Sequence, residues 1–295
     1  DVYLNGKSLY EAASIEKVQT PEVWPQAKFA EDSKLVWYAE AGEKTTKFWA
    51  NFGDTDPNGE NVEIVVRPFC FWPKKTGLNY ITVKGFTICK AAPQWAPPTA
   101  LQEGMIGPHW SKGWIIEDNV VFGTKCVGIS LGKDLDAGHN RGPKGKEKGG
   151  TQREQEVIFH ALQGNWHKDN IGSHIVRNNI IHDCEQAGVV GHLGGAFSTI
   201  EGNTIYHVHH KMIFHGAEVA GIKLHASLDT QIINNKIVIF LKNVFIYDYK
   251  NTAFIWCFYE KKYFFSKLLV RNKKIVFLQR RNGRVVDRGG LENRC

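Results

Sequence analysis

The sequence predicts an all-β fold, a parallel β-helix (solenoid) in which the chain winds through stacked coils of short strands. Two motifs recur with a common spacing, and no amphipathic helix of a dozen residues separates the predicted strands, which disfavours a doubly wound α/β fold. A leucine-rich repeat would have coils of similar length, but its L-x-x-L-x-L signature is missing. Each coil would bury its aliphatic residues against those of the coil below.

The first motif has the form aliphatic-x-x-Asn-x-aliphatic. Its copies are Ile116–Val121, Val176–Ile181, Ile200–Ile205 and Ile232–Ile237. An earlier copy, Val83–Ile88, has Phe86 in the asparagine position. An asparagine at a turn can bond backbone groups and tolerates left-handed geometry, and stacked asparagines can bond one another. The motif therefore predicts a column of amides: Asn119, Asn179, Asn203 and Asn235.

The second motif is a glycine followed by a short apolar strand. Its copies begin at Gly104, Gly128, Gly188 and Gly221. The step from Asn119 to Gly128 equals the step from Asn179 to Gly188, so the two motifs keep pace with each other. One coil is therefore roughly 24 residues long, within the range of solenoid repeats.

Three stretches depart from the repeat and suggest the domain organisation. Residues 1–80 contain stretches of alternating apolar and polar residues, which predict antiparallel or irregular β-strands. This region is expected to cap the first coil, because an open solenoid end presents unpaired strand edges. Residues 81–237 hold the coils. A polar, Gly-rich excursion at 133–170, with a short helix at 154–162, interrupts them; it is either a lid on a groove or a solvated loop.

Residues 238–295 form a divergent tail. Residues 236–295 carry 14 Lys and Arg against 4 Asp and Glu, and Val244 stands where the spacing predicts a glycine. This stretch is either an unusual end of the solenoid or not the native continuation, as a shifted reading frame would produce; we favour the second interpretation. The remaining 23 basic and 26 acidic residues give the main body no basic surface of the kind that nucleic acid needs.

Several function classes are disfavoured by what the sequence lacks. Residues 1–235 contain no run of eighteen apolar residues that would span a membrane. The six cysteines include no C-x-x-C pair for zinc, the coils have no Asp cluster for calcium, and no G-x-S-x-G elbow supplies a serine nucleophile. We therefore expect no metal and no cofactor. The chain starts at Asp1 without a signal peptide, and secreted, periplasmic and cytoplasmic locations all stay open, as does the oligomeric state.

The densest polar stretch is residues 207–227. Glu218 precedes a predicted coil strand, and Lys223 and His225 share one face of that strand at a period of two. A carboxylate beside a lysine and a histidine suits acid–base work on a sugar or binding of its hydroxyls. The alternative is an exposed polar face. A metal site from His207, His209, His210 and His215 fits no standard ligand spacing.

Further residues would extend this site along the stack. His192 occupies the place of His225 one coil earlier, and His109 matches it loosely in the first coil. Trp110 and Trp95 are candidate platforms for sugar rings, although either could equally belong to the core.

The stretches 77–119, 173–206 and 216–235 together resemble the β-xylosidases of glycoside hydrolase family 120, with dense similarity over about residues 35–237. The resemblance implies a right-handed parallel β-helix, often with a small β-sandwich elsewhere in the chain. It further implies retaining exo-hydrolysis that releases xylose from xylo-oligosaccharides without a metal cofactor.

The resemblance also indicates catalytic candidates. The family's nucleophilic Asp lies in a G-I-W-x-D-W-like motif. The corresponding segment here is VFIYDYK, in which Asp248 lies within about one residue of the position of that Asp. Nothing matches the family's V-E-V-N-H-G-P-like acid/base motif, and Glu260 is too close to Asp248. Glu218, His225 and Trp110 fall on matching motifs and are expected to contact sugar, with Glu218 the second catalytic candidate.

The sequence thus predicts a β-xylosidase-like glycoside hydrolase fold acting on xylo-oligosaccharides, with an active site that is incomplete because a retaining mechanism needs two carboxyls about 5–5.5 Å apart. Whether the chain is an enzyme is left open. The first alternative is a β-helix that binds carbohydrate without catalysis. The second is a polysaccharide lyase, which would use Lys or Arg and often Ca²⁺.

Overall fold

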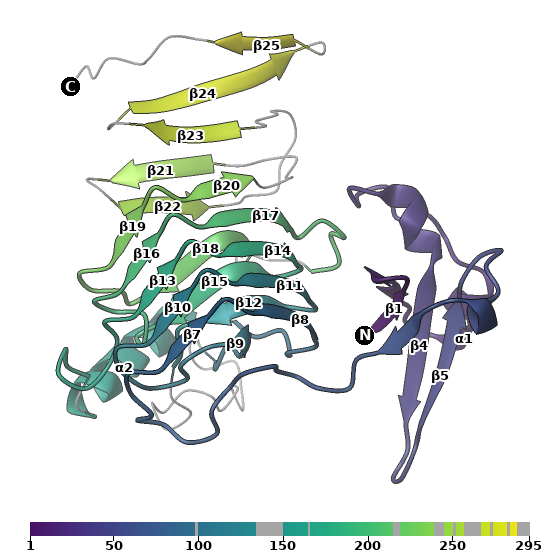
Figure 1. The fold of residues 1–295 in the computed structure, drawn as a ribbon, viewed down its shortest axis with the longest axis horizontal. Helices are drawn as coiled ribbons and strands as arrows, with labels where there is room; N and C mark the ends of the chain where they lie inside the picture. The colour runs from purple at the N-terminus through teal and green to yellow at the C-terminus, as the bar shows by residue number, and fades with distance from the viewer. Residues whose placement is uncertain are drawn as a thin grey trace.

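The computed structural model describes residues 1–97, 100–133, 150–164, 166–214 and 219–238, and beyond them the backbone of five strands between residues 245 and 287. Most regular structure in the described chain is β-strand, and the larger part of it is arranged in three parallel sheets (Figure 1).

The three sheets are built one coil at a time. The first sheet has the strand order β7 (Thr82–Lys84), β10 (Ile115–Glu117), β13 (Ile175–Arg177), β16 (Thr199–Glu201), β19 (Gln231–Ile233). The second has β8 (Thr87–Ala91), β11 (Val120–Thr124), β14 (Ile180–Cys184), β17 (Thr204–Val208), β20 (Lys236–Val238). The third has β9 (Gly104–Ile106), β12 (Val127–Ser130), β15 (Ala187–His192), β18 (Ala220–His225). All neighbours are parallel, and the chain visits the sheets in turn, so we call residues 81–238 the coil stack.

The aliphatic positions of the first motif point into the coil stack. Val83, Ile116, Val176, Ile200 and Ile232 pair in register along the first sheet. A second column, led by Ile88 and Val121, runs through the second sheet, and both columns belong to one buried hydrophobic cluster. Burying each such side chain contributes roughly 1.5–3 kcal/mol, so repetition of the motif supplies the core.

The predicted amide column is confirmed. Asn119 Nδ2 donates to Asn179 Oδ1 at 3.0 Å, Asn179 Nδ2 to Asn203 Oδ1 at 2.9 Å, and Asn203 Nδ2 to Asn235 Oδ1 at 2.8 Å. Each amide also donates to a backbone carbonyl of the first-sheet strand one coil earlier, for example Asn179 Nδ2 to Ile116 O at 2.9 Å. The ladder therefore satisfies polar groups at a turn where Asn119, Asn179 and Asn203 are fully buried.

The left-handed geometry at this turn is not taken by the ladder asparagine, as the sequence suggested, but by the residue before it. Asp118, Asn178 and Asn234 have φ values of 56°, 55° and 53°, and Gly202 has 64°. Asp, Asn and Gly are the residues that tolerate this region best. The ladder asparagine thus keeps its side chain directed into the column while its neighbour makes the bend.

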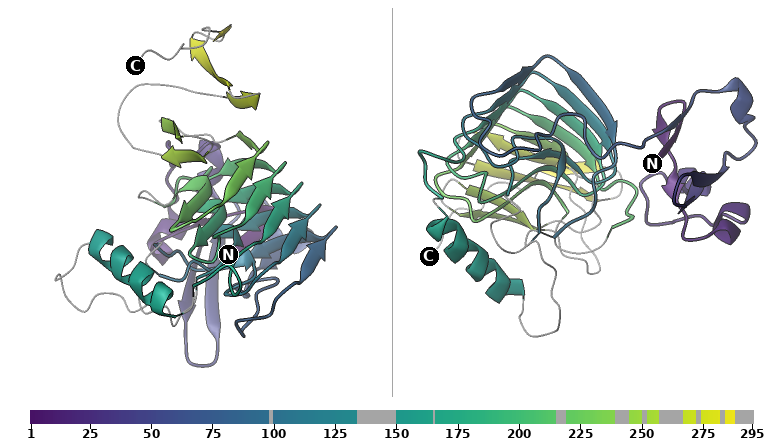
Figure 2. Two further views of the ribbon diagram at one scale, coloured as in Figure 1. Left: turned by 90° about the vertical axis from the view of Figure 1, so that its left-hand side faces the viewer. Right: turned by 90° about the horizontal axis from the view of Figure 1, so that it is seen from below.

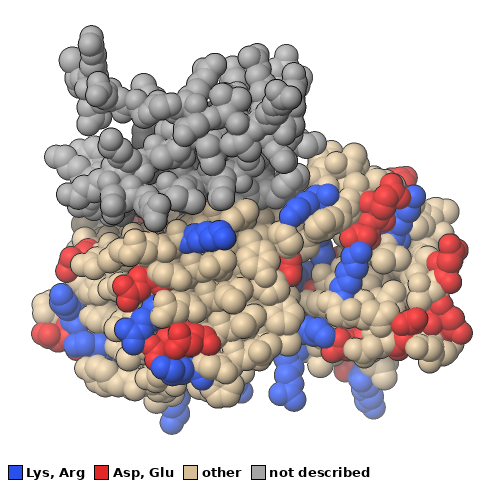
Figure 3. Space-filling model, turned by 45° about the horizontal axis from the view of Figure 1, so that its top comes forward, with Lys and Arg blue, Asp and Glu red and all other residues tan. Residues whose placement is uncertain are grey.

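Charged side chains alternate on the outer face of the first sheet. Glu117 lies in register between Lys84 and Arg177, with Lys84 Nζ at 2.9 Å from Glu117 Oε1 and Arg177 Nε at 2.6 Å from Oε2. Basic and acidic side chains are likewise interspersed over the face of the molecule drawn in Figure 3. Opposite charges therefore face each other from coil to coil.

Residues 1–64 form two small sheets of their own. One has the order β2 (Lys7–Ser8), β1 (Val2–Leu4), β6 (Val62–Ile64), and the other β3 (Tyr10–Glu11), β4 (Val36–Ala41), β5 (Thr46–Asn51). Short helices accompany them: α1 (Ile15–Gln19), η1 (Ala30–Lys34), η2 (Pro57–Gly59). We call residues 1–64 the N-terminal region. It lies beside the coil stack (Figures 1 and 2), which differs from the expected cap because its strands pair with one another.

The contacts with the first coil come instead from the segment after β6. Cys70 N donates to Met105 O at 2.9 Å, and Tyr80 N donates to Lys112 O at 2.9 Å. Phe71 also bridges Ile106 in parallel orientation. This segment partly pairs the edge that an open solenoid end would expose.

The excursion contains α2 (Gly150–Gln163), which confirms the expected helix at 154–162 and extends it; residues 134–149 lie outside the described chain. In the right view of Figure 2, α2 lies at the lower left of the coil stack and the N-terminal region lies at its right. Within the described residues, no helix has the length and apolar character needed to cross a membrane.

Parallel pairing stops after β20. In the tail, β21 (Phe245–Tyr249) pairs antiparallel with β22 (Thr252–Trp256). A second antiparallel group has the order β23 (Lys267–Arg271), β24 (Lys274–Arg281), β25 (Arg284–Asp287). The change in pairing coincides with the loss of the repeat motifs in the sequence.

The asparagine ladder gives a first prediction. Replacing Asn179 by Ala leaves the Ile116 carbonyl and the Asn119 backbone N–H without the side-chain partner that Asn179 supplies in a buried turn. We expect a loss of about 2–4 kcal/mol in the free energy of unfolding, measured by urea titration. Asn235→Ala, at the half-buried end of the ladder, should cost about 1 kcal/mol. Equal losses for both variants would contradict the idea that burial of the turn sets the cost of removing a ladder amide.

Candidate functional site

The outer face of the third sheet carries the sequence-predicted polar residues. Side chains alternate along these strands, so Val189 and Ile222 belong to the core while Lys223 points outward, in register with Val190. Two residues further on, His192 and His225 are paired on the same outer face, with ring centroids 6.1 Å apart in an edge-to-face arrangement. The structure therefore brings together three of the predicted residues: Lys223, His192 and His225.

His109 aligns with this column better than the glycine motif indicated. Gly104 pairs with Val127 and not with Gly128, so the first glycine motif is offset by one residue. Met105 occupies the glycine column, where Gly128 and Gly188 allow close approach of neighbouring backbones. Counted from the paired Ile106, Ile129, Val189 and Ile222, each of His109, Gly132, His192 and His225 stands three residues on.

Trp72 and a turn hold His109 in place. Its ring stacks on Trp72 at a centroid distance of 5.3 Å, and its Nδ1 lies 3.0 Å from the Pro73 carbonyl oxygen. His109 Nε2 is buried and makes no hydrogen bond among the described residues. One coil on, Gly132 has φ +95°, and a Cβ there would lie 1.4 Å from the His109 carbonyl oxygen. Gly132 therefore permits the close contact between these two coils.

Helix α2 adds a carboxylate that the sequence reading missed. Glu154 Oε1 lies 2.7 Å from His192 Nε2, and the His192 side chain is only 2% exposed. Lys133 is buried as well. The outward polar residues are thus backed by a buried cluster, which we call the Glu154 cluster: Lys133, Glu154, His192. Glu154 reaches the outer face of the third sheet only because the excursion carries it there, so no spacing signal within the coils could have identified it.

Burial and charge act in opposite directions within the Glu154 cluster. Burial raises the pKa of Glu154, but His192, His225 and Lys133 outweigh it and leave that pKa lowered, so the carboxylate is ionised. Burial lowers the pKa of Lys133 to about 8, against an opposing effect of Glu154. Burial also lowers the pKa of His192, with Glu154 acting in the other direction, so the imidazole is neutral near neutral pH.

The predicted aromatic platforms have different surroundings. Trp110 is partly buried and packs against a hydrophobic cluster that includes Val157 and Ala161 of α2. Trp95 is 40% exposed. Trp110 thus joins α2 to the first coil, while Trp95 presents more of its surface to solvent.

The two catalytic candidates fall outside the part of the chain whose side chains the structure describes. Glu218 lies in the stretch 215–218, outside the described residues, as does Glu260. Asp248 lies on β21, where only the backbone is described. Both assignments stay predictions.

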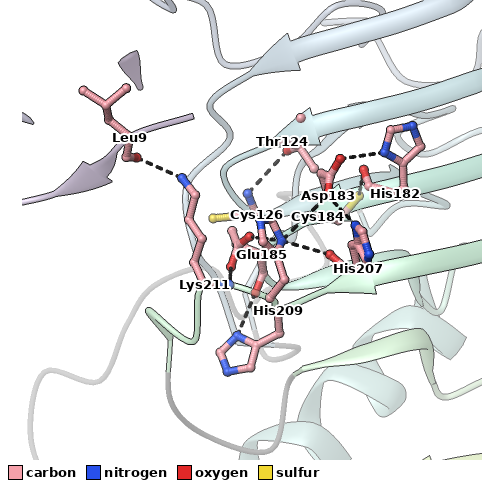
Figure 4. A network of polar contacts seen from close by, with 12 residues as sticks. Leu9, Thr124, Cys126, His182, Asp183, Cys184, Glu185, His207, His209 and Lys211 are labelled. Carbon is pink, nitrogen blue, oxygen red and sulfur yellow. Dashed lines mark hydrogen bonds and ion pairs between the residues drawn. The ribbon is translucent and has the colours of Figure 1, made fainter. Parts of the chain in front are cut away.

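A second polar cluster lies where the N-terminal region meets the coil stack (Figure 4). Asp183 accepts contacts from His182 Nδ1 at 2.7 Å and His207 Nδ1 at 3.2 Å, and His210 Nδ1 lies 2.8 Å from Glu185 Oε1. The buried Lys211 donates from Nζ to the Leu9 carbonyl at 2.9 Å. We call these residues the junction cluster: His182, Asp183, Glu185, His207, His210, Lys211.

The junction cluster ties the N-terminal region to the stack electrostatically. Burial lowers the pKa of His210, but its hydrogen bond to Glu185 and the charge of Asp183 outweigh burial, so the net shift is upward. Burial lowers the pKa of Lys211 to about 8. Neither these groups nor any other three His, Cys, Asp or Glu side chains of the described residues are arranged to hold a metal ion. His207, His209 and His210 make contacts within the protein, and His215 lies outside the described residues.

Comparison with known proteins gives two matches. The family model described as glycoside hydrolase 120, insertion domain, matches residues 1–64. A solved structure described as the complex of XylC with xylose is similar at 51% sequence identity and a TM-score of 0.76, covering 80% of this chain and 39% of that chain. The present chain therefore spans about two fifths of the length of the XylC chain. None of the curated proteins compared with the chain matches it.

Gly132 offers a test of the close coil contact. A methyl group there would overlap the His109 carbonyl, so we expect Gly132→Ala to lower the free energy of unfolding by about 3 kcal/mol or more. Gly77 has a similarly positive φ of +72° but open space around it, so Gly77→Ala should cost only about 1 kcal/mol. Thermal or urea unfolding compares the two; losses of the same size would mean that the clash relaxes freely.

The junction cluster predicts a pH dependence. Because the pKa of His210 is raised in the folded state, its stabilisation is complete below its ordinary value and is lost as pH rises through the raised value. We expect the stability advantage of the wild type over His210→Gln to be larger at about pH 5.5 than at about pH 8.5.

The same urea titrations on His167→Gln serve as a control, because the His167 side chain is 66% exposed beside Asp169. An advantage that stays constant across this range for His210→Gln would show that its contact with Glu185 does not depend on a proton.

Proposed function

We propose that this chain, which is similar to glycoside hydrolase family 120, acts on xylo-oligosaccharides as a retaining β-xylosidase-type glycoside hydrolase. We place the sugar on the outer face of the third sheet, in the right-handed parallel β-helix of that family. The XylC match supports the choice of sugar, because that structure is described with xylose bound and shares 51% of its residues with the aligned part of this chain.

The observation that carries the placement is the paired column of His192 and His225, with Lys223 on the same outer face. A neutral imidazole can donate to and accept from sugar hydroxyls, an ammonium group can donate to them, and half-buried groups do so with less competition from water. His225 and Lys223 are both half-buried, which leaves them within reach of a ligand from solvent.

The proposed chemistry needs two carboxyls. Asp248 would attack the anomeric carbon while an acid gives a proton to the leaving oxygen, and water would then release xylose from the enzyme. We assign the attack to Asp248 and keep Glu218 as the second candidate. No residue of the chain matches the family's acid/base motif, so we propose an incomplete site, with no cofactor.

The competing proposal is a carbohydrate-binding protein without catalysis. The same outer column would support it, since binding needs only Lys223, His225 and their neighbours. A polysaccharide lyase is a weaker third candidate, because the coils lack the Asp cluster that its calcium would use.

Turnover of nitrophenyl β-xyloside separates these proposals. We expect any activity of the chain to be abolished by Asp248→Asn, because the amide cannot form the glycosyl intermediate. No turnover together with xylobiose binding would favour the binding protein, and unsaturated products that absorb ultraviolet light would favour a lyase. Equal rates for the chain and its variant would remove Asp248 from the proposal.

Isothermal titration with xylobiose tests the placement of the sugar. We expect His225→Ala to weaken binding about tenfold, the effect of one hydrogen bond to a buried polar group. His182→Ala is the matched control, because that ring stacks between Phe122 and Tyr206 on the second sheet. Equal losses in both variants would place the sugar elsewhere.

A further inference from the structure

The Glu154 cluster links helix α2 to the outer column. Glu154 comes from α2, His192 from the end of β15, and His225 from the end of β18, the last strand of the third sheet in chain order. His192 is 2% exposed, whereas His225 is half-buried. A ligand approaching from solvent therefore meets His225 first, and His192 and Glu154 lie behind it.

The contact between Glu154 and His192 determines where the His192 proton sits. Glu154 Oε1 lies 2.7 Å from His192 Nε2, too close for two lone pairs to face each other without a proton between them. Because the imidazole is neutral near neutral pH, the Nε2–H form is favoured and Nδ1 is left as an acceptor.

The same contact is short but imperfect. Both Glu154 carboxylate oxygens and His192 Nδ1 are buried, and none of them has a well-directed hydrogen bond among the described residues. Buried polar atoms in this state carry a free-energy cost that a small reorientation can recover. Catalytic and binding contacts are often poorly aligned without ligand and tighten when it binds.

The ring of His192 in turn supports the ring of His225. The two lie edge to face with centroids 6.1 Å apart and an interplanar angle of 73°, and their strands pair in register at these residues. A rotation of the His192 ring would remove this support. The orientation of the half-buried imidazole thus depends on a carboxylate that never reaches the surface.

We propose that Glu154 is a positioning residue of the sugar site, which fixes the tautomer and ring orientation of His192 and through it holds His225 ready for a sugar hydroxyl. This inference rests on the proposed function. It adds to that function a residue from the excursion, so the excursion contributes to the site through α2.

The test uses the full chain labelled with ¹⁵N-histidine, comparing wild type with Glu154→Gln. Because Glu154 raises the pKa of His192, we expect Glu154→Gln to lower the His192 titration midpoint further and to redistribute its tautomers, both visible by NMR. Affinity for xylobiose, measured by isothermal titration, should fall about tenfold. Glu154→Asp, which keeps the charge, should restore part of both effects.

Gln155→Ala is the matched control, since that side chain is exposed on the same helix. It should leave both the His192 spectrum and the affinity at wild-type values. Wild-type affinity in Glu154→Gln would overturn the proposal, whatever the His192 spectrum shows. Failure of the proposed function would differ from this, because the wild-type chain itself would then bind no xylobiose.

Discussion

The coil stack depends on one constraint: every turn that is buried between coils must have its backbone polar groups satisfied. Asn119, Asn179, Asn203 and Asn235 each donate to a carbonyl of the strand one coil earlier, and the first three also donate to the amide of the next coil. A buried donor or acceptor without a partner costs about 1–3 kcal/mol, so the ladder removes a cost that would recur in each coil. Once the turns are fixed in this way, the aliphatic columns come into register.

Register then decides which side chains can act together. A shift of one residue exchanges the two faces of a strand, so the pairing of Val189 with Ile222 places His192 and His225 on the same outer face. The close approach of Gly132 to the His109 carbonyl extends that column toward the first coil. The column of polar residues on the outer face of the third sheet is thus a consequence of the same stacking that builds the core.

The two additions to the stack differ in how they are attached. The N-terminal region is held by polar contacts, including the Lys211 donation to Leu9 and a hydrogen bond from Tyr3 Oη to the Gly123 carbonyl at 2.8 Å, and by Ile213, which packs against its apolar cluster. Helix α2 is held by an apolar cluster around Val157 and Ala161, with Glu154 making its contact beside that cluster. The first attachment includes a histidine, His210, whose pKa is raised by its contact with Glu185, whereas the second sets the surroundings of His192.

The sequence by itself determined the repeat. Asparagine and aliphatic residues at a fixed spacing indicated the stacked strands, the amide ladder and the common place of His192 and His225, because each is a local pattern copied from coil to coil. Only the tertiary structure decided the position of the N-terminal region beside the stack, the left-handed residue before each ladder asparagine, the one-residue offset at Gly104, and the contact of Glu154 with His192. These features join segments that share no repeat, and their geometry follows from packing between distant parts of the chain. Periodicity in the sequence carries no information about such packing.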